Sequence, residues 1–149
     1  MKRFRFRLER FLDLAKYEER QWELRLAEIT GVCVALANEI GSLKGRKAAA
    51  FASRRGLRDA GDLISLELFM KNLEQRAERL EVSLREKEKV RDEVRKGYLE
   101  ASRKRKVLDK LREKKEAEYY KDQNRAEVGV IDDINSGNAA RMSAAASEG

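Results

Sequence analysis

The stretch Leu63–Leu84, with the sequence LISLELFMKNLEQRAERLEVSL, decides the fold of this chain. Its apolar and small residues recur at alternating steps of three and four, which is the a/d spacing of a left-handed coiled coil. These seam positions are Leu63, Leu66, Met70, Leu73, Ala77, Leu80 and Leu84. The stretch therefore predicts a long helix that buries one stripe against a second helix.

Three large apolar residues of the same stretch lie beside this seam: Ile64, Leu68 and Phe69. A single partner helix does not cover residues on both the seam and its flank, and exposed apolar patches mark interaction surfaces. We expect these three side chains to face outward and to meet a partner protein.

The composition agrees with long helices. The chain of 149 residues has no proline, 41% charged residues and 7% aromatic residues, which is typical of helical rods and untypical of a globular core. Its net charge of +7 is spread over many alternating-sign pairs, as on a solvated coiled-coil surface. The lone Cys33 falls on a seam position, so we interpret it as a small buried residue in a reducing compartment.

We expect helix one over about residues 2–54. Its opening, MKRFRFRLERFLDL, is rich in arginine and has Phe4, Leu8 and Phe11 at helical spacing. Acidic residues follow at once, which favours the basic first turn of a mature helix over a mitochondrial presequence. The seam then contains two successive steps of four, which predict a stutter; its positions are Glu18, Trp22, Leu26, Ile29, Cys33, Leu36, Ile40 and Leu43.

Glycines and arginines predict a turn at about residues 54–61, with Gly56 as a left-handed helix-ending residue and Asp62 or Asp59 as the next N-cap. Helix two is expected over about 62–134, where Asn135–Gly137 predicts its end, and 135–149 as a disordered tail. The predicted fold is all-α: residues 1–134 form an antiparallel coiled-coil hairpin of two long helices, the second longer and overhanging.

A turn centred near residue 58 pairs positions whose numbers sum to about 116. Leu43 then lies opposite Leu73, Trp22 opposite the Val94 region and Phe4 opposite Arg112. Residues past roughly 114 have no partner in the chain, which leaves an overhang of about 20 residues, or some 30 Å.

The chemistry of catalysis is absent from the sequence. There is no histidine, only one cysteine and no phosphate-binding glycine loop, so we expect no enzyme, no metal site and no cofactor. Two basic clusters, at Arg103–Lys106 and Lys110–Lys115, are interleaved with acids and short of aromatics, which disfavours nucleic acid and favours an acidic protein partner. No continuous apolar run reaches about 18 residues, so direct membrane insertion is not expected.

Two stretches resemble a known family. The N-terminal FRFRLERFLDL (Phe4–Leu14) and the C-terminal RKVLDKLREKKEAEYYKDQ (Arg105–Gln123) are similar to the two ends of the FliJ family of flagellar type III export proteins. The Phe69-x-x-x-Leu73 pattern after the turn also resembles that family, whereas Arg76 and Leu80 depart from it. The resemblance covers nearly the whole chain.

The resemblance implies a cytoplasmic stalk, peripheral at the inner-membrane export apparatus. It implies as partners a FliI-like hexameric export ATPase with its FliH-like regulator, an FlhA-like export gate protein, and export chaperones. By matching positions, the residues implied for the ATPase ring are Phe4, Phe6, Leu8, Arg10, Phe11, Leu108, Leu111, Lys115 and Tyr119. Those expected at the export gate are Phe69, Leu73, Ile64, Leu68, Leu36, Ile40 and Leu43.

Three alternatives remain open from the sequence. The same class of stalk serves injectisome secretion systems, a generic coiled-coil scaffold has the same seam, and a helix pair with basic clusters is one form of nucleic-acid-binding protein.

Overall fold

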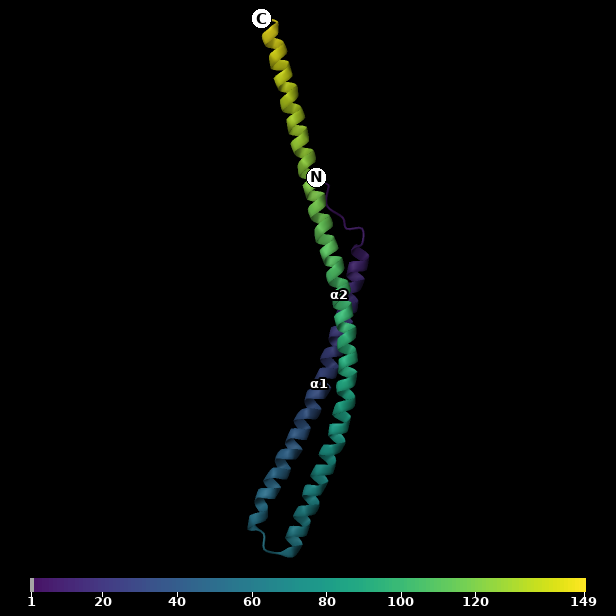
Figure 1. Cartoon of the computed structure of the whole chain (residues 1–149), viewed down its shortest axis with the longest axis vertical. Coiled ribbons are helices and arrows are strands. Elements are labelled where there is room, and N and C mark those ends of the chain that lie inside the picture. Colours follow the sequence, from purple (N-terminus) through teal and green to yellow (C-terminus); the bar gives the residue numbers. More distant parts are fainter. Residues whose placement is uncertain (1) are drawn as a thin grey trace. The chain divides into compact units, whose positions relative to one another are not determined.

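The computed structural model describes residues 2–149 and is all-α. It consists of α1 (Glu9–Ser53), the short 3-10 helix η1 (Arg54–Gly56) and α2 (Ala60–Ser147), with no strand among the described residues (Figure 1). The predicted class is confirmed: two long helices pack against each other, and the second, with 88 residues against 45, is the longer. The chain divides into two units, the first made of residues up to Ala15 with Arg103–Gly149 and the second of Lys16–Ser102.

In the second unit α1 and α2 run antiparallel on either side of the turn (Figure 1). The central core cluster is Leu43, Leu73 and Ala77, with the half-buried Leu80 packed against it. The predicted pairing of Leu43 with Leu73 is therefore confirmed. Longer side chains close the flanks as ion pairs that cross between the helices, Lys44–Glu81 at 2.7 Å, Lys47–Glu74 at 3.2 Å and Arg76–Glu39 at 3.5 Å.

The structure confirms the seam predicted for Leu63–Leu84. All seven predicted seam residues of Leu63–Leu84 are buried or half-buried, while Ile64, Leu68 and Phe69 are exposed. Such a seam stabilises the folded chain mainly by burying apolar surface, which contributes about 25 cal/mol to the free energy of unfolding per Å² removed from water. Cys33, with 3% of its surface exposed, is buried as predicted.

The predicted stutter in α1 is wrong. Glu18 is exposed and Glu19 is half-buried, so the buried face passes through Glu19 and keeps its alternation of three and four. The buried and half-buried positions on this face are Leu12, Ala15, Glu19, Trp22, Leu26, Ile29, Cys33, Leu36, Ile40, Leu43, Lys47 and Ala50. The error came from starting the register at Phe11, which is 62% exposed, instead of Leu12, which is fully buried.

The turn uses different chemistry from the prediction. None of the described glycines has a positive φ, so Gly56 is not a left-handed helix end. The chain leaves α1 through η1 and becomes extended at Leu57, and Asp59 then caps α2 by accepting a hydrogen bond from the Gly61 amide at 3.4 Å. α2 begins beyond the end of α1 (Figure 1), and Trp22 lies against Gly97, about one helical turn beyond Val94.

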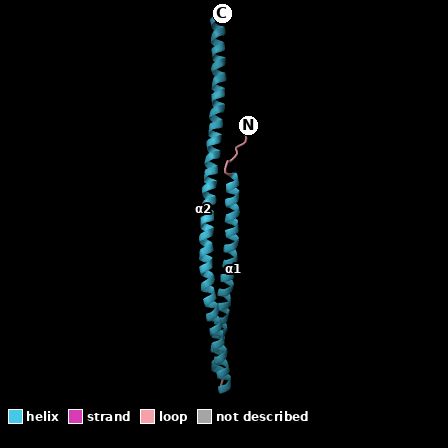
Figure 2. Ribbon diagram, turned by 90° about the vertical axis from the view of Figure 1, so that its right-hand side faces the viewer, coloured by secondary structure: helices cyan, strands magenta, loops and turns pink. Residues whose placement is uncertain are grey.

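The first unit contains the ends of the chain. Residues 2–6 are not helical, and α1 starts at Glu9 instead of near residue 2 (Figure 2). The sequence Phe4-Arg5-Phe6-Arg7-Leu8 alternates apolar and charged residues, which is the period of an extended chain. An extended residue advances about 3.3 Å against 1.5 Å in a helix, so the segment reaches farther along α2 than predicted. Phe4 accordingly contacts Tyr119 instead of Arg112, which pairs with Glu9 at 3.2 Å.

The other end of this unit also differs from the sequence-based expectation. Asn135, Ser136 and Gly137 do not end α2, which continues to Ser147 through the segment expected to be a disordered tail. All residues from Asn124 to Ser147 are exposed except the half-buried Gly137. We call residues 124–147 the C-terminal overhang. It starts about ten residues later than predicted because the extended N-terminal segment covers α2 as far as Tyr119.

By length and composition α1 could cross a membrane. The helical run Glu9–Gly56 contains an 18-residue window with a mean hydropathy of 1.3, of which 17% is buried. The core helix of a soluble protein and a signal sequence near the N-terminus meet the same criterion, so one such helix is weak support for a membrane span. That the chain does not insert in a membrane stays a prediction.

Candidate interaction surfaces

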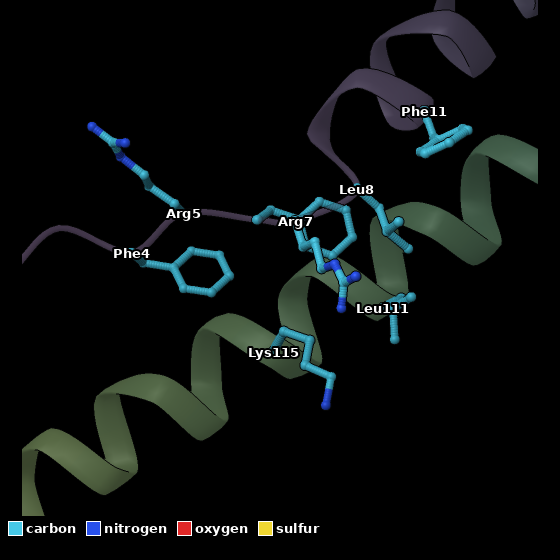
Figure 3. A pocket seen from close by; sticks show the side chains of 8 residues that line it. Phe4, Arg5, Arg7, Leu8, Phe11, Leu111 and Lys115 are labelled. Atoms are coloured by element: carbon cyan, nitrogen blue, oxygen red, sulfur yellow. The ribbon is translucent and has the colours of Figure 1, made fainter.

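The first candidate surface is a groove in the unit that holds the chain ends, between the extended N-terminal segment and α2 (Figure 3). We call it the N-terminal groove. It has a volume of about 590 Å³. Its lining residues are Phe4, Arg5, Phe6, Arg7, Leu8, Phe11, Leu111 and Lys115.

Period-two alternation places the side chains of this segment. Phe4, Phe6 and Leu8 are half-buried, whereas Arg5 and Arg7 are exposed. In Figure 3 the Phe4 ring lies toward α2 and the Arg5 side chain extends away from it. The groove therefore has an apolar floor and a cationic rim, with no carboxylate among its lining residues.

Tyr119 fixes the extended segment on α2. Its ring packs on Phe4 with centroids 5.6 Å apart, and its hydroxyl donates a hydrogen bond of 2.7 Å to the Lys2 carbonyl. The Gln123 amide donates to the same hydroxyl oxygen at 3.0 Å. At the start of α1 the Glu9 carboxylate lies 3.2 Å from Nε of Arg112, which adds an ion pair at the junction of segment and helix.

Most of the residues expected at the ATPase ring meet at this groove. Phe4, Phe6, Leu8, Phe11, Leu111 and Lys115 line it, and Tyr119 joins them through the Phe4 ring. Arg10 is exposed and Leu108 is half-buried, and neither lines the groove. Sequence reasoning missed Arg5 and Arg7 as lining residues, although the apolar–charged alternation of this segment was the signal that could have found them.

The second candidate surface lies in the other unit, beside the turn. We call Ile64, Leu68 and Phe69 the turn-side patch; they are 61%, 60% and 42% exposed. The guanidinium of Arg46 lies over the Phe69 ring at 5.8 Å, within the range of a cation–π contact. The patch therefore offers an apolar surface with a cation at its edge.

The other residues expected at the export gate are buried or half-buried. Leu73, Ile40 and Leu43 are buried between α1 and α2 and have almost no surface to offer a partner, and Leu36 is half-buried. The turn-side patch is thus the accessible part of that set. Among residues 2–149 no group of three or more His, Cys, Asp or Glu side chains is placed to hold a metal ion.

One ionisable group on the paired face has a perturbed pKa. The hydrogen bond and positive charge of Lys44 hold the pKa of Glu81 below its ordinary value of 4.5, with a smaller contribution from the charge of Arg85. Partial desolvation of the carboxylate opposes this shift. The carboxylate thus takes part in closing the hairpin, and Lys44 is the main cause of its shift.

Comparison with protein families identifies the family of this chain. The family model described as Flagellar FliJ protein matches residues 4–143, which is nearly the whole chain and includes the N-terminal groove and the turn-side patch. No curated protein and no solved structure matched. Since the family model spans far more than half of the sequence, the chain belongs to the FliJ family, whose members are non-enzymatic components of flagellar protein export.

Proposed function

We propose that this protein is the stalk-like helical hairpin that links the flagellar export ATPase to the export gate. The observation that carries the proposal is the N-terminal groove, which joins an apolar floor to a rim of Arg5, Arg7 and Lys115. Apolar side chains hold a partner, and charge steers it and sets its orientation. A FliI-like ATPase ring with acidic, partly apolar loops is the partner that this surface fits, in the presence of its FliH-like regulator.

The turn-side patch is the proposed contact with the FlhA-like export gate. Its side chains lie beside the seam and not on it: Ile64 and Leu68 are about 60% exposed, and Phe69, 42% exposed, lies under the Arg46 guanidinium of α1. The same surface is open to export chaperones. The groove and the patch belong to different units, so the two partners have separate contact surfaces on this chain.

The ATPase contact is tested by Phe4→Ala combined with Phe6→Ala. We expect roughly a tenfold loss of ATPase stimulation, because truncating apolar anchors of a binding site costs about 1–2 kcal/mol or more. The measurement is the rate of ATP hydrolysis by the FliI-like hexamer against the concentration of the variant. Phe51→Ala, which truncates a phenylalanine that is 60% exposed in the other unit, is the matched control. Undiminished stimulation by the double variant contradicts the ring assignment.

The gate contact is tested by comparing Phe69→Ala with Leu73→Ala. Phe69 is 42% exposed and Leu73 is 5% exposed, so the first change leaves the melting curve nearly unaltered and the second destabilises the hairpin by about 2–5 kcal/mol. Binding of the isolated FlhA-like cytoplasmic domain, measured by calorimetry, falls for Phe69→Ala while the fold persists. Wild-type affinity of Phe69→Ala removes the patch from the gate interface.

A further inference from the structure

The C-terminal overhang is a helix whose side chains are exposed and have no packing partner among residues 2–149. Its large apolar side chains are more than half exposed, with exposed fractions of 55–76%. These side chains are Val128, Val130, Ile131, Ile134 and Met142. Figure 1 shows this part of α2, green to yellow, continuing past the N-terminus within the unit that holds both chain ends.

The composition of the overhang is poor for an isolated helix. It contains Gly129 and Gly137, several asparagines and four β-branched residues, all of which have lower helix propensity than alanine. A glycine in a helix interior costs about 1 kcal/mol relative to alanine. Packing of the apolar face of the overhang on another surface therefore adds to the stability of this part of α2.

Charge within the same unit indicates which surface fits. Residues 2–15 with 103–116 contain thirteen Lys and Arg against five Asp and Glu, a net charge of +8, which exceeds the +7 of the whole chain. The overhang itself, residues 124–147, contains two arginines against three Asp and Glu, a net charge of −1. The acids of the overhang stand next to its apolar residues, as Glu127 does beside Val128 and as Asp132 and Asp133 do between Ile131 and Ile134.

We propose that the overhang of one copy binds the N-terminal groove of a second copy, and that the exchange is reciprocal. The overhang supplies apolar side chains with carboxylates, and the groove supplies an apolar floor with Arg5, Arg7 and Lys115 at its rim. The two surfaces are complementary in both respects, and reciprocal use of both makes a closed two-fold interface.

The lengths agree with this arrangement. If two α2 helices lie antiparallel about a two-fold axis near residue 121, positions equally far from that residue come level with each other. Ile131 is then level with Leu111, and Glu127 is level with Lys115, both of which line the groove. The overhang has the length needed to cover the groove of its partner without any change in α2.

The dimer hides the N-terminal groove from any other partner. A groove partner such as an ATPase ring must displace the second copy, so self-association limits the amount of free protein that is competent to bind. The dimer itself does not rest on the proposed function, because it follows from surfaces of this chain alone.

The test is sedimentation velocity of the full chain over a range of concentrations and at low and high salt. We expect a monomer–dimer equilibrium that weakens as salt rises. Arg5→Glu with Arg7→Glu reverses the rim, and Asp132→Lys with Asp133→Lys reverses the acids of the overhang. Each doubly substituted chain alone is expected to lose about tenfold or more in dimer affinity.

An equimolar mixture of the two substituted chains restores the dimer. In that mixture each reversed surface meets its reversed complement, while the two unaltered surfaces meet each other. The control is Lys87→Glu with Lys89→Glu, which makes the same change in net charge on exposed residues of the other unit and leaves the dimer intact. A chain that stays monomeric at all concentrations, or substituted chains that do not complement each other, overturns the proposal. Neither readout involves an ATPase, so failure here is distinct from failure of the stalk assignment.

Discussion

Trp22 and Gly97 lie in close contact between the two helices of the second unit. A Cβ atom built on Gly97 lies 2.6 Å from Cζ3 of Trp22, which is closer than any real Cβ contact. The Arg25 guanidinium lies over the indole, 5.0 Å from the ring centroid. The tryptophan thus contacts both a cation and the bare backbone at Gly97, and the glycine is required for its size and not for its dihedral angles.

This contact predicts opposite outcomes for two glycine-to-alanine changes. At Gly41, where a Cβ atom meets nothing within 4 Å, alanine raises helix stability by about 0.5–1 kcal/mol. At Gly97 the methyl group displaces the indole, and such overpacking costs about 1–3 kcal/mol, which outweighs the gain in propensity. Thermal unfolding measures both changes, and Trp22 fluorescence reports displacement of the ring. Equal stabilisation by Gly41→Ala and Gly97→Ala would show that the indole moves aside freely.

At the scale of the helices, ion pairs across the seam make stability depend on pH. The pKa of Glu81 is lowered in the folded chain by the hydrogen bond and charge of Lys44, 2.7 Å away. A carboxyl group with a depressed folded pKa stabilises the fold above its unfolded pKa, and this contribution is lost as pH falls through the folded value. Both groups are close to solvent, so the contribution is small and screened by salt.

We therefore expect Glu81→Gln to lower the melting temperature at pH 7, and we expect this effect to shrink as pH falls through the lowered folded pKa and the wild-type carboxyl becomes protonated. The measurement is thermal unfolding by circular dichroism at low salt from pH 7 downward. Glu78→Gln removes a carboxylate one turn earlier on α2 and serves as the control for net charge. A difference between wild type and Glu81→Gln that is constant with pH would exclude the Lys44 pair as its origin.

The same scale shows what the sequence could predict. Along Leu63–Leu84 each seam residue is apolar or small and three or four positions from the next, so period alone assigned both the buried stripe and the exposed Ile64, Leu68 and Phe69. At Phe4–Leu8 the chain satisfies two periods at once: Phe4 and Leu8 are a helical step apart, and Phe4, Phe6 and Leu8 alternate with arginine. The packing of Phe4 on Tyr119, 115 positions away, favours the extended segment over the helix. A local sequence pattern carries no information about such a long-range contact.

Prediction of the helix ends failed for a related reason. Asn135–Gly137 is a local signal for a helix end, yet α2 continues because an alanine-rich segment, which favours helix, follows to Ser147.

The candidate interaction surfaces could be predicted only in part from the sequence. Apolar residues were found by period and family resemblance, but the cationic rim of Arg5 and Arg7 depends on an extended backbone that the helical interpretation excluded.

At the scale of the whole molecule, the residues that form the hydrophobic core differ from those of the C-terminal overhang, which are exposed and free to bind a partner. Among the described residues, the buried apolar side chains all lie before Ser102, at Leu12, Ala15, Cys33, Ile40, Leu43, Leu73, Ala77 and Ala101. The overhang contributes none of them. Its sequence is therefore free to serve intermolecular contacts, since changes there remove no buried side chain.

This separation predicts different results for two truncations. Removing residues 124–149 takes away exposed helix, so at concentrations at which the full chain is monomeric we expect an unchanged melting temperature and an extended N-terminal segment that stays on α2. Removing residues 116–149 also takes Tyr119, and with it both the ring that packs on Phe4 and the hydroxyl that binds the Lys2 carbonyl. The segment then detaches, because its burial against α2 depends on that side chain.

The measurement is the rate of trypsin cleavage after Arg3, Arg5 and Arg7. We expect this rate to rise at least tenfold for the shorter chain only, in proportion to the population of the open segment. Tyr119→Phe in the full chain keeps the ring and loses the 2.7 Å hydrogen bond, so its cleavage rate falls between the two truncations. Equal cleavage of both truncated chains would show that Tyr119 does not hold the segment and that the groove is formed by α1 and α2 alone.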